Sequence, residues 1–167
     1  MRTRRPPRVT PIVDPSSGQL LAFARASTGN VVQFDRDPSS GQWSAYDLGA
    51  LYGVPPTVGP VLPAIEPDYS SSPIAFAPAN GGDVLQYSRP GTANTPWRAL
   101  DLSAPFGLGT TTGPIVPWTD PDYSSSLLAM DVAANGDVLT LGRRTSDGSW
   151  HRVDLTTAWP QHRQRAA

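Results

Sequence analysis

The chain contains three copies of one short unit, and this repeat constrains its fold more than any other feature. The apolar segments LLAF, PIAF and LLAM begin at Leu20, Pro73 and Leu127, roughly every 53 residues. The same spacing separates a glycine, an arginine and a tryptophan in each unit: Gly29, Gly82 and Gly136; Arg36, Arg89 and Arg143; Trp43, Trp97 and Trp150. A repeat of this length is one small structural unit that buries its apolar surface against its neighbours.

Each unit predicts four short strands. The apolar runs are short and are separated by Gly, Asn, Asp and Pro, which favours strands over helices. We expect a first strand in segments such as GPVLP (59–63) and GPIVP (113–117), a second in the LLAF-type segments, a third in VVQF, VLQY and VLTL, and a fourth beginning at the tryptophan. The glycine of each unit lies between the second and third strands, where tight hairpin turns need positive φ. No helix start is convincing, so the sequence predicts an all-β fold.

The repeat also predicts the domain organisation. We expect a flexible basic N-terminus at 1–8, repeats at 9–58, 59–112 and 113–159, and a polar tail at 160–167. The basic start MRTRRPPR is followed by no apolar segment of the kind found in signal peptides. No apolar run approaches the roughly 18 residues of a membrane helix. We therefore expect either a cytoplasmic protein or one released without a signal peptide.

The third unit, with GPIVP, LLAM, NGDVLTLGRR and SDGSW in this order, resembles a blade of bacterial β-propeller lectins. The resemblance implies a partial propeller of three blades. The alternative is a β-trefoil, because three repeats close a trefoil, whereas propellers have about 4 to 8 blades. Three blades leave two sheet faces open. We therefore expect oligomerisation, either a dimer that forms a six-bladed ring or a hetero-partner that supplies further blades.

The resemblance also implies a function, namely multivalent carbohydrate binding at shallow sites between blades. In the fucose-binding propellers an arginine, a glutamate and a tryptophan hold the sugar. Here no arginine stands in LLAF, PIAF or LLAM, and Gln33, Gln86 and Thr140 lie near the place of the glutamate. The sequence therefore departs from that ligand set.

Three groups of residues are candidates for a binding site. Aromatic rings stack on sugars, but large aromatics are more often buried, so we favour packing for Trp43, Trp97 and Trp150. Arg36, Arg89 and Arg143 could clamp an acidic sugar, although pairing with a neighbouring carboxylate is the favoured interpretation. The third group lies in EPDYSSS and DPDYSSS, where Asp68, Tyr69, Asp122 and Tyr123 could bind hydroxyls or only form a turn. Unit one has DPSSGQ there and lacks the tyrosine.

Composition argues against several other functions. The net charge of −1 offers no basic field for nucleic acid. There is no cysteine, and neither His151 nor His162 stands in a metal-binding or catalytic spacing. We therefore predict a binding protein that is not an enzyme and needs no cofactor or metal. The alternative function is that of a structural or assembly subunit whose repeats bind another protein.

Overall fold

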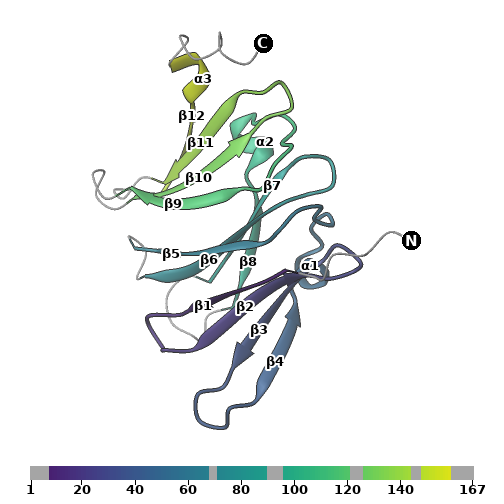
Figure 1. Cartoon of the computed structure of the whole chain (residues 1–167), viewed down its shortest axis with the longest axis vertical. Coiled ribbons are helices and arrows are strands. Elements are labelled where there is room, and N and C mark those ends of the chain that lie inside the picture. The colour runs from purple at the N-terminus through teal and green to yellow at the C-terminus, as the bar shows by residue number, and fades with distance from the viewer. Residues whose placement is uncertain (1–7, 68–70, 90–95, 121–125, 144–147, 159–167) are drawn as a thin grey trace.

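Three four-stranded antiparallel sheets follow one another along the chain in a computed structural model (Figure 1). The structure describes residues 8–67, 71–89, 96–120, 126–143 and 148–158. The strands of the first sheet are β1 (Val9–Val13), β2 (Leu20–Arg25), β3 (Val31–Arg36) and β4 (Trp43–Asp47). Those of the second are β5 (Leu62–Glu66), β6 (Ser72–Pro78), β7 (Val84–Ser88) and β8 (Arg98–Asp101). Those of the third are β9 (Val116–Asp120), β10 (Ser126–Val132), β11 (Val138–Arg143) and β12 (Trp150–Asp154).

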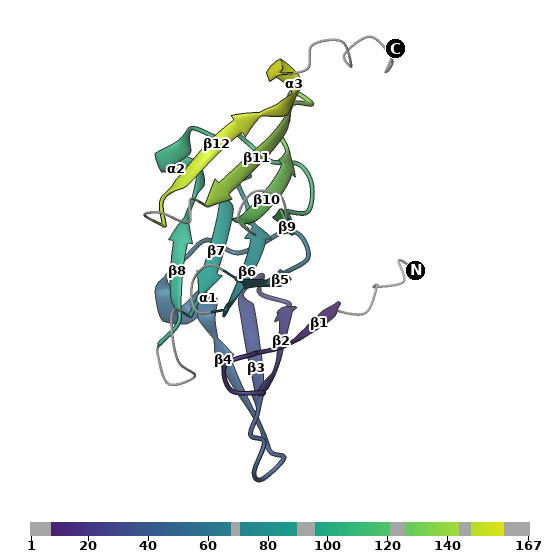
Figure 2. The same ribbon diagram turned by 90° about the vertical axis from the view of Figure 1, so that its left-hand side faces the viewer.

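The sheets stack face to face in chain order, and strand order within each sheet is also chain order (Figures 1 and 2). The first strands of successive sheets are neighbours, with β1 beside β5 and β5 beside β9. This arrangement confirms the predicted all-β fold with three repeated sheets, which we call blades 1, 2 and 3. The β-trefoil alternative is wrong, because the repeats form separate stacked sheets and close no common barrel.

The predicted strands are present, but several boundaries differ, and β8 begins at Arg98 rather than at Trp97. The first strands of blades 2 and 3 begin at Leu62 and Val116, three residues after the glycines of GPVLP and GPIVP. They continue to the acidic residues Glu66 and Asp120. Glycine and proline are both depleted in strands, so the Gly-Pro pairs stay outside the sheets.

In the described part of the chain, three helices of a single turn follow the fourth strands, although no helix start is convincing in the sequence. They are α1 (Leu48–Tyr52), α2 (Ser103–Phe106) and α3 (Leu155–Ala158). In blades 1 and 3 the aspartate of the Asp-Leu pair begins the turn: Asp47 accepts a hydrogen bond from the Ala50 amide at 2.9 Å, and Asp154 accepts one from the Thr157 amide at 3.1 Å. In blade 2 the N-cap is Leu102, and Asp101 accepts from the Ser103 amide at 2.7 Å. Aspartate is a preferred N-cap, and one turn is too short to show a helical period in the sequence.

Each blade has two different faces, which the strand register defines. In blades 2 and 3 the upstream face points toward the preceding blade. In every blade this face carries the arginine and the tryptophan that recur in each repeat; in blade 1, Arg36 pairs with Trp43 across β3 and β4. The downstream face points toward the following blade and carries Phe23 in blade 1, Phe76 in blade 2 and Met130 in blade 3. Successive residues of a strand point to opposite faces, so this assignment holds along every strand.

The apolar core lies between the blades. Leu21 and Phe23 from the downstream face of blade 1 pack with Ala75 and Tyr87 from the upstream face of blade 2. Ile74 and Phe76 of blade 2 form a second cluster with residues of blade 3, including Ala129, Leu139 and Leu141. Each blade is therefore stabilised by its neighbour, and β6, which supplies residues to both clusters, is buried along its whole length.

The segments that join the blades cross the hairpin turns of the preceding blade. Thr57 donates from its amide and its hydroxyl to the Gly29 carbonyl at 2.7 and 2.8 Å, and the Thr111 amide donates to the Gly82 carbonyl at 2.8 Å. Gly29 and Gly82 have φ of +94° and +93°. A Cβ added at Gly82 would lie 2.2 Å from Thr110 Cγ2. Glycine is required at these turns both for its φ and for the close approach of the joining segment.

One buried carboxyl disturbs this core. Asp131 of β10 is 5% exposed and lies on the upstream face of blade 3, where blades 1 and 2 have Ala24 and Ala77. Neither of its carboxylate oxygens finds a hydrogen-bond partner among the described residues. Burial raises the pKa of Asp131 above 3.8, and the nearby amide of Val132 offsets only part of this effect.

We predict that Asp131→Ala stabilises the fold near neutral pH by about 1 to 3 kcal/mol, because it removes a buried carboxylate without a partner. The raised pKa means that the native state binds the proton more tightly, so the wild type loses stability as pH rises above 3.8 through the folded pKa. The gap between variant and wild type should therefore widen over that range. Denaturant unfolding at several pH values measures it. Asp131→Asn is the matched control: its stability should lack this pH dependence. Destabilisation by Asp131→Ala at neutral pH would contradict the prediction.

Candidate functional site

Two ion pairs join the three blades. Arg89 donates from Nη2 to an oxygen of Asp14, and Arg143 donates from Nη1 to an oxygen of Glu66. In each pair the acid lies at the end of the first strand of one blade, and the arginine ends the third strand of the next. The Arg89 and Asp14 side chains are 4% and 0% exposed. Two of the three arginines therefore have the pairing role that the sequence favours.

The tryptophans of blades 2 and 3 pack at the same two junctions. The Trp97 ring meets the Phe23 ring edge to face, with centroids 5.4 Å apart, and the Arg89 guanidinium lies 5.5 Å from the Trp97 centroid. Trp150 meets Phe76 in the same way at 5.9 Å. Each junction thus contains an acid, an arginine, a tryptophan and a phenylalanine, in an arrangement that favours aromatic and cation–π contact.

Asp14 is held in its ionised form by its surroundings. Burial raises its pKa, but hydrogen bonds from Ser16, its hydroxyl at 2.7 Å and its amide at 2.9 Å, outweigh that effect. Hydrogen bonding to Ser17 and the charge of Arg89 add to them, so the pKa of Asp14 is lowered below 3.8. At neutral pH the junction therefore contains a charged pair.

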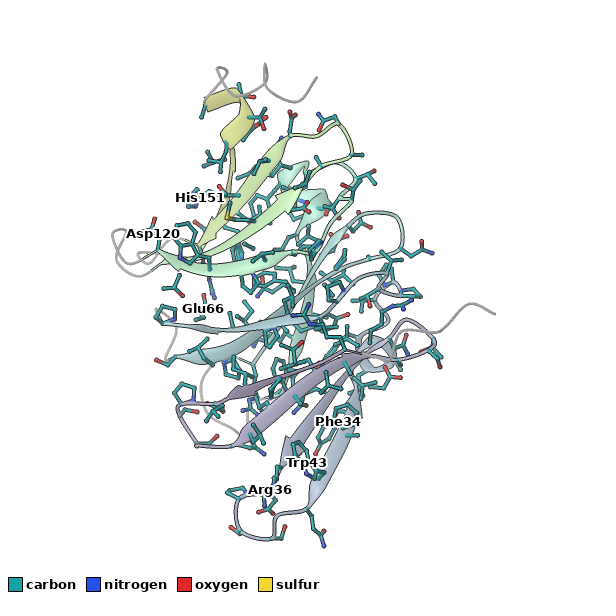
Figure 3. All side chains as sticks on the ribbon, in the orientation of Figure 1. Phe34, Arg36, Trp43, Glu66, Asp120 and His151 are labelled. Carbon is teal, nitrogen blue, oxygen red and sulfur yellow. The ribbon has the colours of Figure 1, made fainter. Side chains whose placement is uncertain are left out.

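Blade 1 presents the remaining arginine and tryptophan to solvent (Figure 3). Trp43 is 51% exposed, whereas Trp97 is 8% exposed at the corresponding position. The turn that follows β3 positions Arg36: its Nη2 atom lies 3.0 Å from the place of a Cβ at Gly41. In blade 3 the Nε atom of Arg143 donates to the Gly148 carbonyl at 2.8 Å.

The other predicted site residues lie outside the described part of the chain. Asp68 and Tyr69 fall between β5 and β6, and Asp122 and Tyr123 fall between β9 and β10. Their role in ligand binding stays a prediction.

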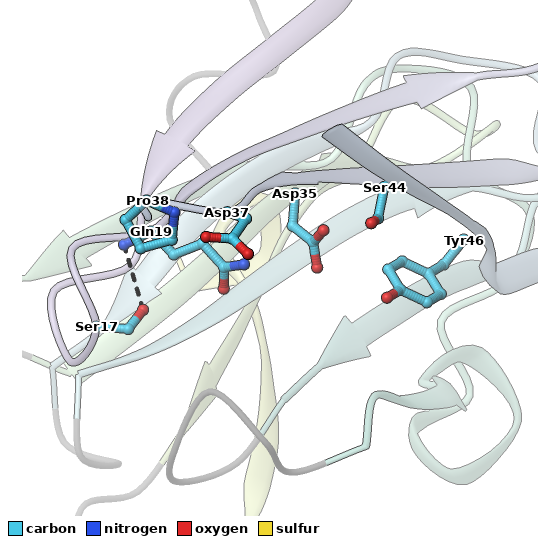
Figure 4. A pocket seen from close by; sticks show the side chains of 7 residues that line it. All are labelled: Ser17, Gln19, Asp35, Asp37, Pro38, Ser44 and Tyr46. Atoms are coloured by element: carbon cyan, nitrogen blue, oxygen red, sulfur yellow. Dashed lines mark hydrogen bonds between the residues drawn. The ribbon is translucent and has the colours of Figure 1, made fainter. Parts of the chain in front are cut away.

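An open hollow of about 440 Å³ lies on the downstream face of blade 1, at the end of β3 and β4 (Figure 4). Asp35 pairs with Ser44 across these strands, and Tyr46 shares their face. Two turns complete the lining, which consists of Ser17, Gln19, Asp35, Asp37, Pro38, Ser44 and Tyr46.

The two turns beside the hollow have the same sequence, DPSSGQ, at 14–19 and 37–42. Their hydrogen bonds are also the same: the Ser16 amide donates to Asp14 Oδ1 at 2.9 Å, and the Ser39 amide donates to Asp37 Oδ1 at 2.7 Å. In both, the glycine has positive φ, +69° at Gly18 and +72° at Gly41. Sequence reasoning missed the hollow, although this identical pair of hexapeptides within one repeat was a signal for it.

The hollow combines an aromatic ring with hydrogen-bonding groups. Tyr46 is 45% exposed, so one side of its ring is open to a ligand. The amides of Ser40 and Ser39 donate to Asp37 and hold the pKa of its carboxyl below 3.8, so that it is an ionised acceptor at neutral pH. Asp35 adds a second carboxyl group and Ser44 a hydroxyl. At the position of Tyr46, blades 2 and 3 have Leu100 and Val153 instead, so this set belongs to blade 1.

Within the described residues, no three His, Asp or Glu side chains cluster in a way that could hold a metal ion. In the same part of the chain, none of the helices has the length and apolar character needed to span a membrane.

Comparison with known proteins relates the fold to lectins. No protein-family model and no curated protein sequence matches the chain. The solved structure of AofleA from Arthrobotrys oligospora matches 88% of this chain with a TM-score of 0.59 and 10% identity. A fucose lectin from Kordia zhangzhouensis, solved with methyl-fucoside, matches 87% with a TM-score of 0.52 and 15% identity. This chain covers 41% of AofleA and 97% of the Kordia lectin. These similarities show a shared fold, that of propeller-type lectins.

We predict that Arg89→Met destabilises the fold by about 3 to 5 kcal/mol at neutral pH, because it leaves the Asp14 carboxylate buried without its cation. The loss should shrink as pH falls below 3.8 through the lowered pKa of Asp14, since protonation then removes the pair in the wild type as well. Denaturant unfolding at several pH values measures both effects. The exposed Arg98, changed to Met, is the control and should shift stability by less than about 0.5 kcal/mol. Equal effects of the two variants would contradict the prediction.

Proposed function

We propose that this chain is a carbohydrate-binding, lectin-like propeller subunit with shallow binding sites at the blade edges, and that it is not an enzyme. The observation that carries the proposal is the hollow of blade 1, where the open Tyr46 ring lies beside two aspartates and a serine. The fold shared with a fucose lectin supports the same function.

The chemistry of the hollow suits a sugar. The apolar face of a pyranose stacks on an aromatic ring, and sugar hydroxyls donate to ionised carboxylates in short, strong hydrogen bonds. Asp35 and Asp37 supply such acceptors on one side, and Tyr46 supplies the ring on the other (Figure 4). The hollow is open and mostly polar, so it fits one exposed sugar unit better than a large apolar ligand.

Open sites of this kind bind weakly, and repetition compensates for this. When several sites engage one glycan surface, avidity exceeds the affinity of any single site by about 10² to 10⁴. We infer that the loops containing Tyr69 and Tyr123 serve blades 2 and 3, while the hollow serves blade 1, whose loop lacks the tyrosine. The three sites of a chain are then not identical.

The second candidate function is that of a structural or assembly subunit. Large apolar side chains exposed on blades 1 and 3, such as Trp43 and Trp118, support it, since exposed apolar patches commonly mark protein interfaces. A glycan array without hits, together with recovery of a stoichiometric protein partner, would favour this function over sugar binding.

Changing Tyr46 tests the hollow directly. A glycan array, beginning with methyl-fucoside, identifies the best ligand, and calorimetric titration with that ligand measures its affinity. In Tyr46→Ala the affinity of the blade 1 site should fall at least tenfold, about 1.4 kcal/mol. Tyr46→Phe keeps the ring and should retain most of the affinity. Leu100→Ala changes the same register position on blade 2 and is the matched control. Unchanged affinity and stoichiometry in Tyr46→Ala would remove the hollow from the proposal.

Combining Tyr69→Ala with Tyr123→Ala tests the other two sites. The double variant should lose the binding sites of blades 2 and 3, retain that of blade 1, and keep the molecular mass of the wild type. Calorimetric stoichiometry and light scattering measure these quantities. An unchanged number of bound ligands per chain would contradict a binding role for the PDYSSS segments and leave them only the role of forming a turn.

A further inference from the structure

The two junctions inside the chain are built from the same four positions. The downstream face of one blade supplies the acid and the phenylalanine; the upstream face of the next supplies the arginine and the tryptophan. Asp14, Phe23, Arg89 and Trp97 form the first junction. Glu66, Phe76, Arg143 and Trp150 form the second.

The upstream face of blade 1 and the downstream face of blade 3 each carry one half of such a junction. Arg36 and Trp43 stand on the upstream face of blade 1, with Phe34 beside them. Asp120 and Met130 stand on the downstream face of blade 3. Figure 3 shows Arg36 and Trp43 on blade 1 at one end of the stack of sheets and Asp120 on blade 3 at the other. The two halves are complementary in charge, a cation on one and a carboxyl group on the other.

Corresponding side chains are buried on the inner faces of the blades and exposed on these two outer faces. Val61 and Ile115 are 2% and 0% exposed on the upstream faces of blades 2 and 3, but Val9 is 53% exposed at the same position of blade 1. On the downstream face of blade 3, Val116 and Trp118 are 46% and 52% exposed. Inside the chain, the second and third strands of such a face are covered by the opposite face of another blade, as the burial of Phe23 and Phe76 shows.

We propose that two copies of this chain associate about a two-fold axis, so that the upstream face of blade 1 in each packs on the downstream face of blade 3 in the other. A second copy is the occupant because it carries both missing halves. Two copies give six blades, within the roughly 4 to 8 of closed propellers, whereas three copies would give nine. Closure by two-fold symmetry covers both faces and leaves no further face for growth.

The contacts across this interface follow from the inner junctions. Arg36 of one copy binds Asp120 of the other, as Arg89 binds Asp14. Asp120 also has an interaction within its own chain, as Glu66 does, and a carboxylate with two oxygens can accept from several donors. Met130 takes the place of Phe23 and Phe76 against Trp43, and a thioether packs favourably against an aromatic ring.

Light scattering on a size-exclusion column tests the assembly. The wild type should elute at micromolar concentration with twice the 17.8 kDa mass of one chain. Arg36→Glu and Asp120→Arg should each weaken dimerisation at least tenfold, because each places like charges opposite one another. The combined Arg36→Glu, Asp120→Arg variant restores opposite charges and should restore the dimer. Arg98→Glu reverses an exposed charge on β8, away from both faces, and should leave the dimer intact.

A second pair of variants keeps the test independent of the charged residues. Trp43→Arg introduces a charge into the apolar interface and should give a folded monomer; Leu51→Arg alters a side chain that is 64% exposed on α1 and should remain dimeric. Circular dichroism and thermal unfolding check that each variant is folded. A wild type that stays monomeric, or whose mass rises beyond two copies with concentration, would overturn the proposal. Failure of the combined charge variant to dimerise would overturn the Arg36 to Asp120 contact.

Discussion

Face-to-face packing of one small sheet on the next is the interaction on which the rest of the structure depends. Among the described residues, both apolar clusters contain side chains of two blades, so a blade shares its core with its neighbour. A four-stranded sheet buries its two faces only through its neighbours, and the burial of large side chains such as Phe23 and Tyr87 supplies the driving force. Where a neighbour is absent, at blades 1 and 3, the same positions carry exposed apolar side chains.

The buried ion pairs have a different role from the apolar packing. Taking a carboxylate and a guanidinium out of water is costly, and their attraction recovers that cost only with good geometry and further hydrogen bonds. Asp14 has both, through Arg89 and the Ser16 hydrogen bonds. Apolar contacts tolerate sliding of one sheet over another, whereas a charged pair has one acceptable position. The pairs therefore fix the register between blades more than they add stability.

The sequence predicted the repeated part of the molecule well. The period identified the blades, and the glycines at Gly29 and Gly82 identified the hairpin turns. The partners of the arginines could not be predicted, because Asp14 lies 75 residues before Arg89 and nothing in the local pattern connects them. The one-turn helices and the hollow of blade 1 were missed for a related reason. Each depends on a few side chains that meet through turn geometry, which leaves no period in the sequence.

The complete burial of β6 has a consequence for how this chain can change over time. Both of its faces contact other blades, so none of its seven residues is available to acquire a new role without disturbing two cores. The rim of blade 1 is different: the counterparts of Asp35 are Ser88 and Gly142, those of Ser44 are Arg98 and His151, and those of Tyr46 are Leu100 and Val153. Variation in side-chain chemistry is therefore tolerated at the rim of a blade, while the central strand of the middle blade preserves the architecture.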